Sequence, residues 1–314
     1  MSKVYTLYLD KLSEPMEQMI ISMCPPEVDL RFLEPNVGKQ GCIEDAECLI
    51  VTTYKCTKEV IERAKHLKLI QRTGIGLDMV DVAYAKQKNI PISVCVGINS
   101  QGVAELTILF ILALYRHLTT LDELTRKGEW HTWTYRHDSF DLYKKTVGII
   151  GAGTIGKEVM KRLKGFDVEI LYNDVVRMDQ DTEEKYGCSY VSREELLQRS
   201  DVVSLHVPLL DSTRGMIGKK EFAMMKDNAV LINTSRSQLL VVEDLIEALN
   251  NKIIHGAALD VFHPADEPFG RTVRNLITMP HIGAATYDTY YRVYSFCLNN
   301  IQNLALNNEL QCLI

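Results

Sequence analysis

The segment from Thr146 to Gly156 constrains the fold more than any other part of the chain. It runs as a short apolar stretch and then breaks into the pattern Gly-x-Gly-x-x-Gly, formed by Gly151, Gly153 and Gly156. A helix-like sequence over 157–163 follows directly. In a βαβ unit of this kind, the first glycine permits the tight turn and the second lets the backbone approach phosphates. The third lets the helix pack on the strand, and the helix N-terminus attracts a pyrophosphate.

A second apolar run over 168–172 is followed by Asp174, 18 residues after Gly156. An acidic residue at this distance binds the ribose hydroxyls of NAD. Arg177 lies nearby and leaves some use of NADP open, although the Asp174 carboxylate would repel a 2′-phosphate. Because glycine turns also occur for structural reasons alone, the prediction of an NAD-binding domain rests on the agreement of strand, turn, helix and acid.

The overall composition bounds the function classes. The 314 residues suffice for two domains, and 46% hydrophobic with 24% charged residues is typical of a globular protein. The net charge of −6 and the lack of a Lys/Arg block argue against nucleic acid or a membrane as partner. The apolar run 106–115 is shorter than the ~18 residues that a membrane span needs, and no signal peptide is recognised. We expect a cytoplasmic protein.

The eight cysteines are scattered and form no Cys-x-x-Cys pair. Cys42 and Cys48 are too far apart for a zinc knuckle and have no histidines nearby. We therefore expect reduced, buried thiols and no metal site.

Alternating strand-like and helix-like segments extend over the whole chain. Before the glycine motif we expect strands at 4–9, 48–52, 67–71 and 92–96 and helices at 58–67 and 80–88. After it we expect strands at 201–206, 229–233, 256–261 and 276–279 and helices at 193–198, 219–225, 242–249 and 289–306. Repeated βα units of this kind predict parallel sheets.

The segment 99–118 is apolar on most helical faces. A helix of that type must be buried, either between domains or in a subunit interface. We expect both uses, and hence a homodimer through this helix.

Three turns that follow apolar runs carry polar groups suited to chemistry. Arg236 ends the segment 233–236 at the carboxyl edge of the predicted sheet, and its planar guanidinium suits a carboxylate. His281 follows another predicted strand and is suited to carry a proton near neutral pH. The acidic segment 260–267 offers carboxylates that would hold the His281 ring and raise its pKa. Taken singly, each turn also has a purely structural interpretation.

Together these segments resemble the D-isomer-specific 2-hydroxyacid dehydrogenases, which include phosphoglycerate dehydrogenase, glyoxylate/hydroxypyruvate reductase and D-lactate dehydrogenase. The resemblance covers about 67–286, with matches at 72–78, 97–99, 103–105, the glycine motif, 206–208, 233–236, 259–262 and 280–283. It implies an α/β protein of two doubly wound parallel-sheet domains. A Rossmann-type NAD domain would span 99–285, and a flavodoxin-like substrate domain would span 1–98 and be completed by 286–314.

The resemblance also implies a reaction and its residues. The reaction would be hydride transfer between NAD(H) and C2 of a small D-2-hydroxy acid or 2-oxo acid. Arg236 would bind the carboxylate, His281 would act as acid and base, and Glu267 would pair with His281. The implied cofactor residues are Gly151, Gly153, Thr154, Ile155, Gly156, Asp174, Thr107, His206, Val207, Pro208, Thr213, Thr234, Ser235, Asp260 and Gly283. The implied substrate residues are Gly74, Ile75, Gly76, Tyr54 and Lys55.

The chain also departs from the family pattern. The family carries a Glu five residues after the aspartate that is Asp260 here, but this chain has Ala265 at that position. Glu267 is the favoured partner of His281, with Asp266 and His263 as alternatives. Lys55 would meet a phosphate or second carboxylate of the substrate, or else be a solvated surface lysine. The alternative function is a non-enzymatic NAD-sensing protein similar to the C-terminal-binding corepressors, which share the family fold.

Overall fold

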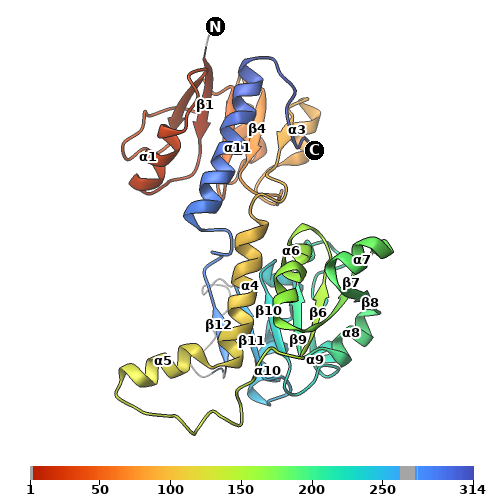
Figure 1. Cartoon of the computed structure of the whole chain (residues 1–314). Coiled ribbons are helices and arrows are strands. Elements are labelled where there is room, and N and C mark those ends of the chain that lie inside the picture. Colours follow the sequence, from red (N-terminus) through yellow and green to blue (C-terminus); the bar gives the residue numbers. More distant parts are fainter. Residues whose placement is uncertain (1–2, 262–272, 274) are drawn as a thin grey trace. The chain divides into compact units, whose positions relative to one another are not determined.

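The chain folds into two α/β units, and both the beginning and the end of the chain belong to the first unit. The computed structural model describes residues 3–261, 273 and 275–314. The first unit comprises residues 1–99 and 287–314, and the second comprises residues 100–286 (Figure 1).

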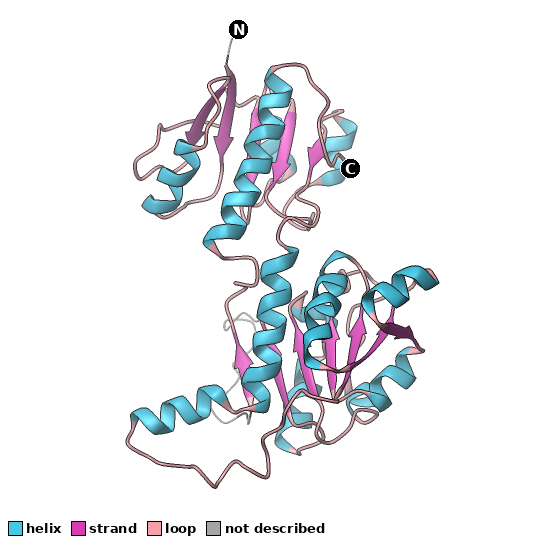
Figure 2. Cartoon of the chain, viewed as in Figure 1, coloured by secondary structure: helices cyan, strands magenta, loops and turns pink. Residues whose placement is uncertain are grey.

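The first unit is built on a parallel sheet with the strand order β2-β1-β3-β4-β5. The strands are β1 (Val4–Tyr8), β2 (Val28–Phe32), β3 (Cys48–Val51), β4 (Leu69–Arg72) and β5 (Ile92–Ser93). Helices α1 (Glu14–Ser22) and α11 (Tyr287–Ala305) cover one face, and α2 (Lys58–Arg63) and α3 (Val82–Gln87) cover the other (Figure 2). This is the flavodoxin-like order. Because helices cover both faces, every side chain of β3 and β4 is buried.

The second unit is built on a parallel sheet of seven strands in the order β12-β11-β10-β9-β6-β7-β8. The strands are β6 (Thr146–Ile150), β7 (Glu169–Asn173), β8 (Cys188–Tyr190), β9 (Val202–Leu205), β10 (Val230–Asn233), β11 (Gly256–Leu259) and β12 (Leu276–Thr278). Counted from β6, this is the Rossmann order 3-2-1-4-5-6 with one further strand. The predicted fold class, with two doubly wound parallel sheets, is confirmed.

Two helical layers cover the seven-stranded sheet. One layer contains α4 (Ser100–Tyr115), α6 (Thr154–Leu163) and α7 (Gln180–Tyr186). The other contains α8 (Arg193–Arg199), α9 (Lys219–Phe222) and α10 (Val242–Asn250). Short 3₁₀ helices lie at Lys164–Phe166 and Ser237–Leu239. Because all strands run in parallel, the turns that follow them lie at one carboxyl edge.

Helix α5 (Leu118–Arg126) and the loop after it differ from the rest of the second unit. They project from the body of the unit, and no residue of α5 is buried (Figure 1).

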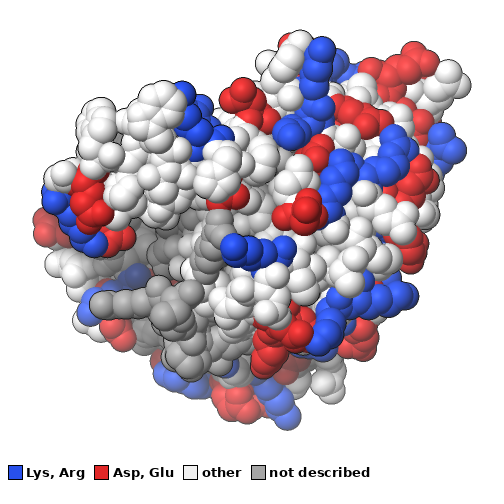
Figure 3. Space-filling view, turned by 90° about the horizontal axis from the view of Figure 1, so that it is seen from below, with Lys and Arg blue, Asp and Glu red and all other residues white. Residues whose placement is uncertain are grey.

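Among the described residues no single helix is long and apolar enough to cross a membrane. Only the α4–α5 pair meets that criterion, as a segment bent by 61°, and most of α4 is buried in its own unit. On the face drawn in Figure 3, acidic and basic side chains are interspersed.

The differences from the sequence-based elements have physical reasons. The segments of β2, α5, α7 and β8 carry no continuous apolar run, and α1 carries only the short run 19–21. Strand β2, for example, alternates buried residues with the partly exposed Asp29 and Arg31, because it is an edge strand. The expected strand at 92–96 is only two residues long. All eight cysteines are free thiols, but Cys42 and Cys312 are exposed, contrary to the expectation of buried thiols.

Candidate functional site

The glycine turn between β6 and α6 combines close packing with one open position. Gly151 has a φ of +99°, and a Cβ there would lie 2.6 Å from the carbonyl carbon of His206. A Cβ on Gly156 would overlap the carbonyl oxygen of Gly151, so both positions require glycine. At Gly153, in contrast, a Cβ would meet no described non-neighbouring atom within 4 Å, and Gly153 and Thr154 are exposed. The N-terminus of α6 is therefore accessible to a phosphate.

Asp174 lies directly after β7 and contacts the same turn. Its Oδ2 accepts a hydrogen bond of 2.6 Å from the backbone N–H of Ala152, and its Oδ1 accepts one from Val176 at 3.3 Å. The Arg177 guanidinium donates to both carboxylate oxygens of Glu183, at 3.0 and 3.2 Å. This pairing raises the pKa of Arg177 and, with the Tyr172 hydroxyl, lowers the pKa of Glu183. Asp174 thus lies beside the glycine turn, and Arg177 forms an ion pair with Glu183.

The loop after β9 carries the next expected cofactor residues. His206 Nε2 lies 2.9 Å from the hydroxyl of Ser204, and burial lowers the pKa of His206 to about 4. Its Nδ1 is buried without a hydrogen-bond partner among the described residues. Val207 packs against the core, and Thr213 donates from its hydroxyl to the carbonyl oxygen of Pro208 at 2.7 Å. At neutral pH the His206 ring is therefore neutral. The hydrogen bond between Thr213 and Pro208 holds the loop that follows it.

The turn after β10 is held by a buried asparagine. Asn233 donates from Nδ2 to the carbonyl oxygen of Arg236 at 2.8 Å and accepts at Oδ1 from the N–H of Ser235 at 3.0 Å. The Ser235 hydroxyl donates to the carbonyl oxygen of Leu205 in β9, at 2.9 Å. The Arg236 guanidinium donates from Nη1 to the carbonyl of Ser235 at 2.8 Å. The backbone that carries Arg236 is thus fixed from both sides.

Asp260 fixes the backbone next to His281. This aspartate follows β11, is 1% exposed, and accepts hydrogen bonds from the N–H groups of Ile282 (2.8 Å) and Gly283 (2.7 Å). Burial raises the pKa of Asp260, while these two N–H groups act in the opposite direction. A Cβ on Gly283 would lie 2.9 Å from Asp260 Oδ2, so the turn favours glycine there. His281 is exposed and has a φ of +58°, in the left-handed region.

Helix α4 closes this edge of the sheet. The hydroxyl oxygens of Thr107 and Thr234 are 3.5 Å apart, and the Thr107 hydroxyl donates to the carbonyl of Val103 at 2.9 Å. Leu106 and Val103 would both lie 3.5 Å from a Cβ on Gly283. The structure therefore brings Thr107 together with the turns that carry Thr234 and Gly283.

The expected partner of His281 is not placed. Glu267 and its alternatives Asp266 and His263 lie outside the described residues. The pairing of His281 with any of them stays a prediction.

In the first unit, a buried aspartate holds the loop expected to face the substrate. Asp10, which lies just after β1, accepts hydrogen bonds from the N–H groups of Thr52 (2.7 Å), Thr53 (2.6 Å) and Tyr54 (2.7 Å). The Thr53 hydroxyl adds another at 2.6 Å. Lys55, the next residue, is exposed. Asp10 was missed by the sequence interpretation, although an acid directly after a strand is a signal that could have indicated it.

Arg72 holds the same loop from its other side. Its Nη1 donates to the carbonyl oxygens of Val51, at 2.9 Å, and Thr52, and its Nε donates to the carbonyl of Gly76 at 2.9 Å. One guanidinium therefore joins the loop after β3 to the loop 74–76 after β4. Ile75 in that loop is 56% exposed. Each of the two loops expected to bind substrate in this unit is thus held by a buried charged side chain, Asp10 or Arg72.

Comparison with known proteins gives a consistent family. The family model for the D-isomer specific 2-hydroxyacid dehydrogenase NAD binding domain matches residues 108–283. A glyoxylate reductase from Thermococcus litoralis is 37% identical over 278 residues, covering 83% of this chain and 82% of the relative. A hydroxypyruvate reductase from Thermotoga maritima is 34% identical over 290 residues, covering 90% and 92%. Among solved structures, a D-lactate dehydrogenase from Aquifex aeolicus complexed with NAD and lactic acid is 27% identical, with a TM-score of 0.80 over 96% of both chains.

Proposed function

Because the chain belongs to the D-isomer-specific 2-hydroxyacid dehydrogenases, we propose that it transfers a hydride between NAD(H) and C2 of a small D-2-hydroxy acid or 2-oxo acid. The observation that carries this proposal is the carboxyl edge of the seven-stranded sheet. There the open glycine turn, the anchored Arg236 turn and the His281 turn held by Asp260 all follow parallel strands. These are the groups that such a reaction requires.

Arg236 and His281 act on different groups of the substrate. The planar guanidinium of Arg236 binds the substrate carboxylate and polarises the C2 carbonyl. His281 donates a proton to the carbonyl oxygen in reduction and takes it back in oxidation. In this proposal Glu267 holds the protonated imidazole, with Asp266 and His263 as the alternatives. The position of His281 is supported by the Asp260 clamp on the two residues that follow it.

NAD(H), when bound, supplies the hydride acceptor or donor. The N–H groups of Gly153, Thr154 and Ile155 at the start of α6, where Gly153 and Thr154 are exposed, would bind the pyrophosphate, and Asp174 would bind the adenosine ribose. The ion pair between Arg177 and Glu183 supports NAD over NADP, because it engages the cation that would otherwise bind a 2′-phosphate. The other proposed cofactor-lining residues are Gly151, Gly156, Thr107, His206, Val207, Pro208, Thr213, Thr234, Ser235, Asp260 and Gly283.

We assign substrate binding in the first unit to its two anchored loops. Backbone N–H groups of Gly74, Ile75 and Gly76 bind the substrate carboxylate. Tyr54 and Lys55 contact the far end of the substrate. This assignment makes residues 1–99 with 287–314 the substrate domain and residues 100–286 the NAD domain.

We also propose that the protein is a homodimer. Leu109 on α4 and Leu118 on α5 are 52% and 53% exposed, and Trp130 and Trp133 in the following loop are 84% and 75% exposed. Exposed apolar side chains on a projecting segment are typical of a protein–protein interface. Sedimentation velocity tests this proposal, and a purely monomeric species at micromolar concentration would disprove it.

The function is tested by following NADH oxidation with glyoxylate, hydroxypyruvate, pyruvate, 3-phosphohydroxypyruvate and branched 2-oxo acids. Turnover on at least one acid is expected. His281→Ala should lower kcat by ~10²–10⁴-fold, which is the usual contribution of a positioned acid or base. Arg236→Ala should abolish most turnover with little loss of NADH affinity. NADH binding without turnover on any acid would instead indicate the NAD-sensing alternative.

A further inference from the structure

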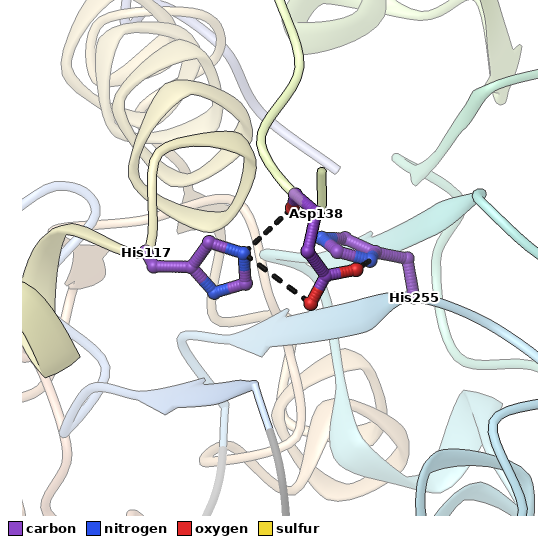
Figure 4. Close-up of side chains that lie close together, drawn as sticks. All are labelled: His117, Asp138 and His255. Atoms are coloured by element: carbon purple, nitrogen blue, oxygen red, sulfur yellow. Dashed lines mark hydrogen bonds and ion pairs between the residues drawn. The ribbon is translucent and has the colours of Figure 1, made fainter. Parts of the chain in front are cut away.

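Three side chains with metal-binding atoms converge in the second unit, away from the turns described above (Figure 4). His117 lies between α4 and α5, Asp138 lies in the loop that returns from α5 to β6, and His255 immediately precedes β11. His117 Nε2 is 3.7 Å from Asp138 Oδ2, and His255 Nδ1 is 3.5 Å from Asp138 Oδ1. The carboxylate therefore contacts both imidazoles, whose ring centroids are 5.4 Å apart.

The cluster is shielded from solvent. The side chains of His117 and His255 are 4% and 6% exposed, and that of Asp138 is 21% exposed. The Tyr135 ring packs 4.9 Å from that of His117, and the Phe140 ring packs 5.1 Å from that of His255. Burial beside aromatic rings lowers the local dielectric and so strengthens the attraction between a cation and its ligands.

We propose that His117, Asp138 and His255 bind one Zn²⁺ ion. Two imidazoles and a carboxylate form a donor set that suits zinc, with the fourth position left to a water molecule. The ligand atoms all lie within 4.8 Å of one another. Zinc bonds of ~2.0–2.1 Å in a tetrahedron place neighbouring ligands about 3.4 Å apart. The separations of 3.7 and 3.5 Å involve the two different carboxylate oxygens, so the side chains must rotate to bring one oxygen and both ring nitrogens to that value.

Binding must move the proton on Nε2 of His117. This nitrogen lies 2.7 Å from the backbone carbonyl oxygen of Asp138, which only accepts, so Nε2 carries the proton of that hydrogen bond. Zinc takes Nε2 in the other neutral tautomer of the ring, with the proton on Nδ1, and the hydrogen bond to the carbonyl breaks.

The ion would connect three segments that are distant in the sequence. It would tie the base of α5 and the returning loop to the start of β11, whereas no residue of α5 itself is buried. Zinc should therefore stiffen the projecting segment 118–138. This inference does not depend on the proposed dehydrogenase activity.

The proposal is tested by titrating chelator-stripped full-length protein with Zn²⁺ against a chromophoric chelator, with Co²⁺ absorption as a second probe. We expect one ion per chain. His117→Asn retains a residue that tolerates the left-handed backbone at this position, where φ is 49°. This variant and His255→Gln should each weaken binding by at least ~10-fold, the scale set by losing a group that supports a metal site. His137→Gln, at the exposed neighbour of Asp138, is the matched control and should bind as the unmodified protein does.

Limited trypsin digestion supplies a readout of structure. Arg126, Lys127 and Arg136 are exposed in the projecting segment, and Zn²⁺ should slow their cleavage in the unmodified protein and in His137→Gln. It should have no such effect in His255→Gln. Equal zinc affinity in all variants would overturn the proposal, because binding would then belong to surface groups such as His131 and Glu129. Absence of binding in the unmodified protein would overturn it as well, leaving an ion-pair cluster.

Discussion

Asp10 in the first unit and Asp260 in the second both hold a loop by accepting hydrogen bonds from backbone N–H groups, but the two loops differ. Each follows a strand and accepts backbone N–H bonds from a loop far away in the sequence. Asp260 is 1% exposed and holds a tight turn in which Gly283 has no room for a side chain. Asp10 is 9% exposed and holds three successive N–H groups of an open loop. We infer that the second unit fixes one reacting group, while the first shapes a surface for recognition.

Among the three carboxylate anchors, the largest effect should come from Asp260→Asn, which replaces one acceptor oxygen with an NH₂ group facing a backbone N–H. The turn after His281 would shift, and a misplacement of ~1 Å at a reacting group costs about 100-fold in rate. We expect kcat to fall by that order while NADH affinity, measured by fluorescence, falls by less, because Asp260 is only one of many proposed cofactor-lining residues. If NADH affinity fell as far as kcat, Asp260 would act through the cofactor and not through His281.

A smaller effect, of a different kind, should follow Asp10→Asn. Losing a charged acceptor costs about 1.5 kcal/mol or more, which corresponds to roughly tenfold in affinity. KM for the 2-oxo acid should therefore rise by about tenfold, with kcat and NADH affinity nearly unchanged. Asp45→Asn, at an exposed position of the same unit, is the control. A fall in kcat at constant KM would remove the distinction between the two aspartates.

The smallest effect on turnover should come from Glu17→Gln. The Glu17 carboxylate also holds a loop of the first unit, but that loop is not one of the expected substrate loops. We therefore expect the substitution to lower stability and leave turnover nearly unchanged. Burial raises the pKa of Glu17, but N–H bonds from Val37, Asn36 and Gly38 outweigh it and the pKa is lowered. The stabilisation is therefore present above the unfolded pKa of ~4.3 and is lost as the pH falls through the lower folded value. Urea unfolding should show a deficit of about 1.5–3 kcal/mol at pH 7. A deficit that did not shrink toward acid pH would contradict the pKa argument.

The regular part of the fold was predictable because its signals are local. Strands β3, β9 and β10 are buried on both faces and appear in the sequence as apolar runs. The glycine turn was recognisable because the positive φ of Gly151 and the contact of Gly156 with the Gly151 carbonyl both arise within one βα unit. The turns of Arg236 and His281 could be placed at a sheet edge because each follows a strand.

Other features could not be read from local pattern. Strand β2 carries Asp29 and Arg31 between its buried residues, which gives half of the apolar signal. Helix α5 has no core contact to detect. Closely spaced cysteines and histidines are the local signal of a metal site, and their lack predicted none. His117, Asp138 and His255 lack such spacing and meet only in the folded chain.

The sequence by itself determined the two βα-repeat units, the phosphate turn and the identity of the residues suited to carboxylate binding and proton transfer. These depend on periodicity and on steric limits between near neighbours, which one strand–turn–helix unit contains. The tertiary structure alone decided which loops Asp10, Arg72 and Asp260 hold, and that two histidines face one carboxylate. Such contacts arise from strand order and helix packing, which bring together residues that no local pattern connects.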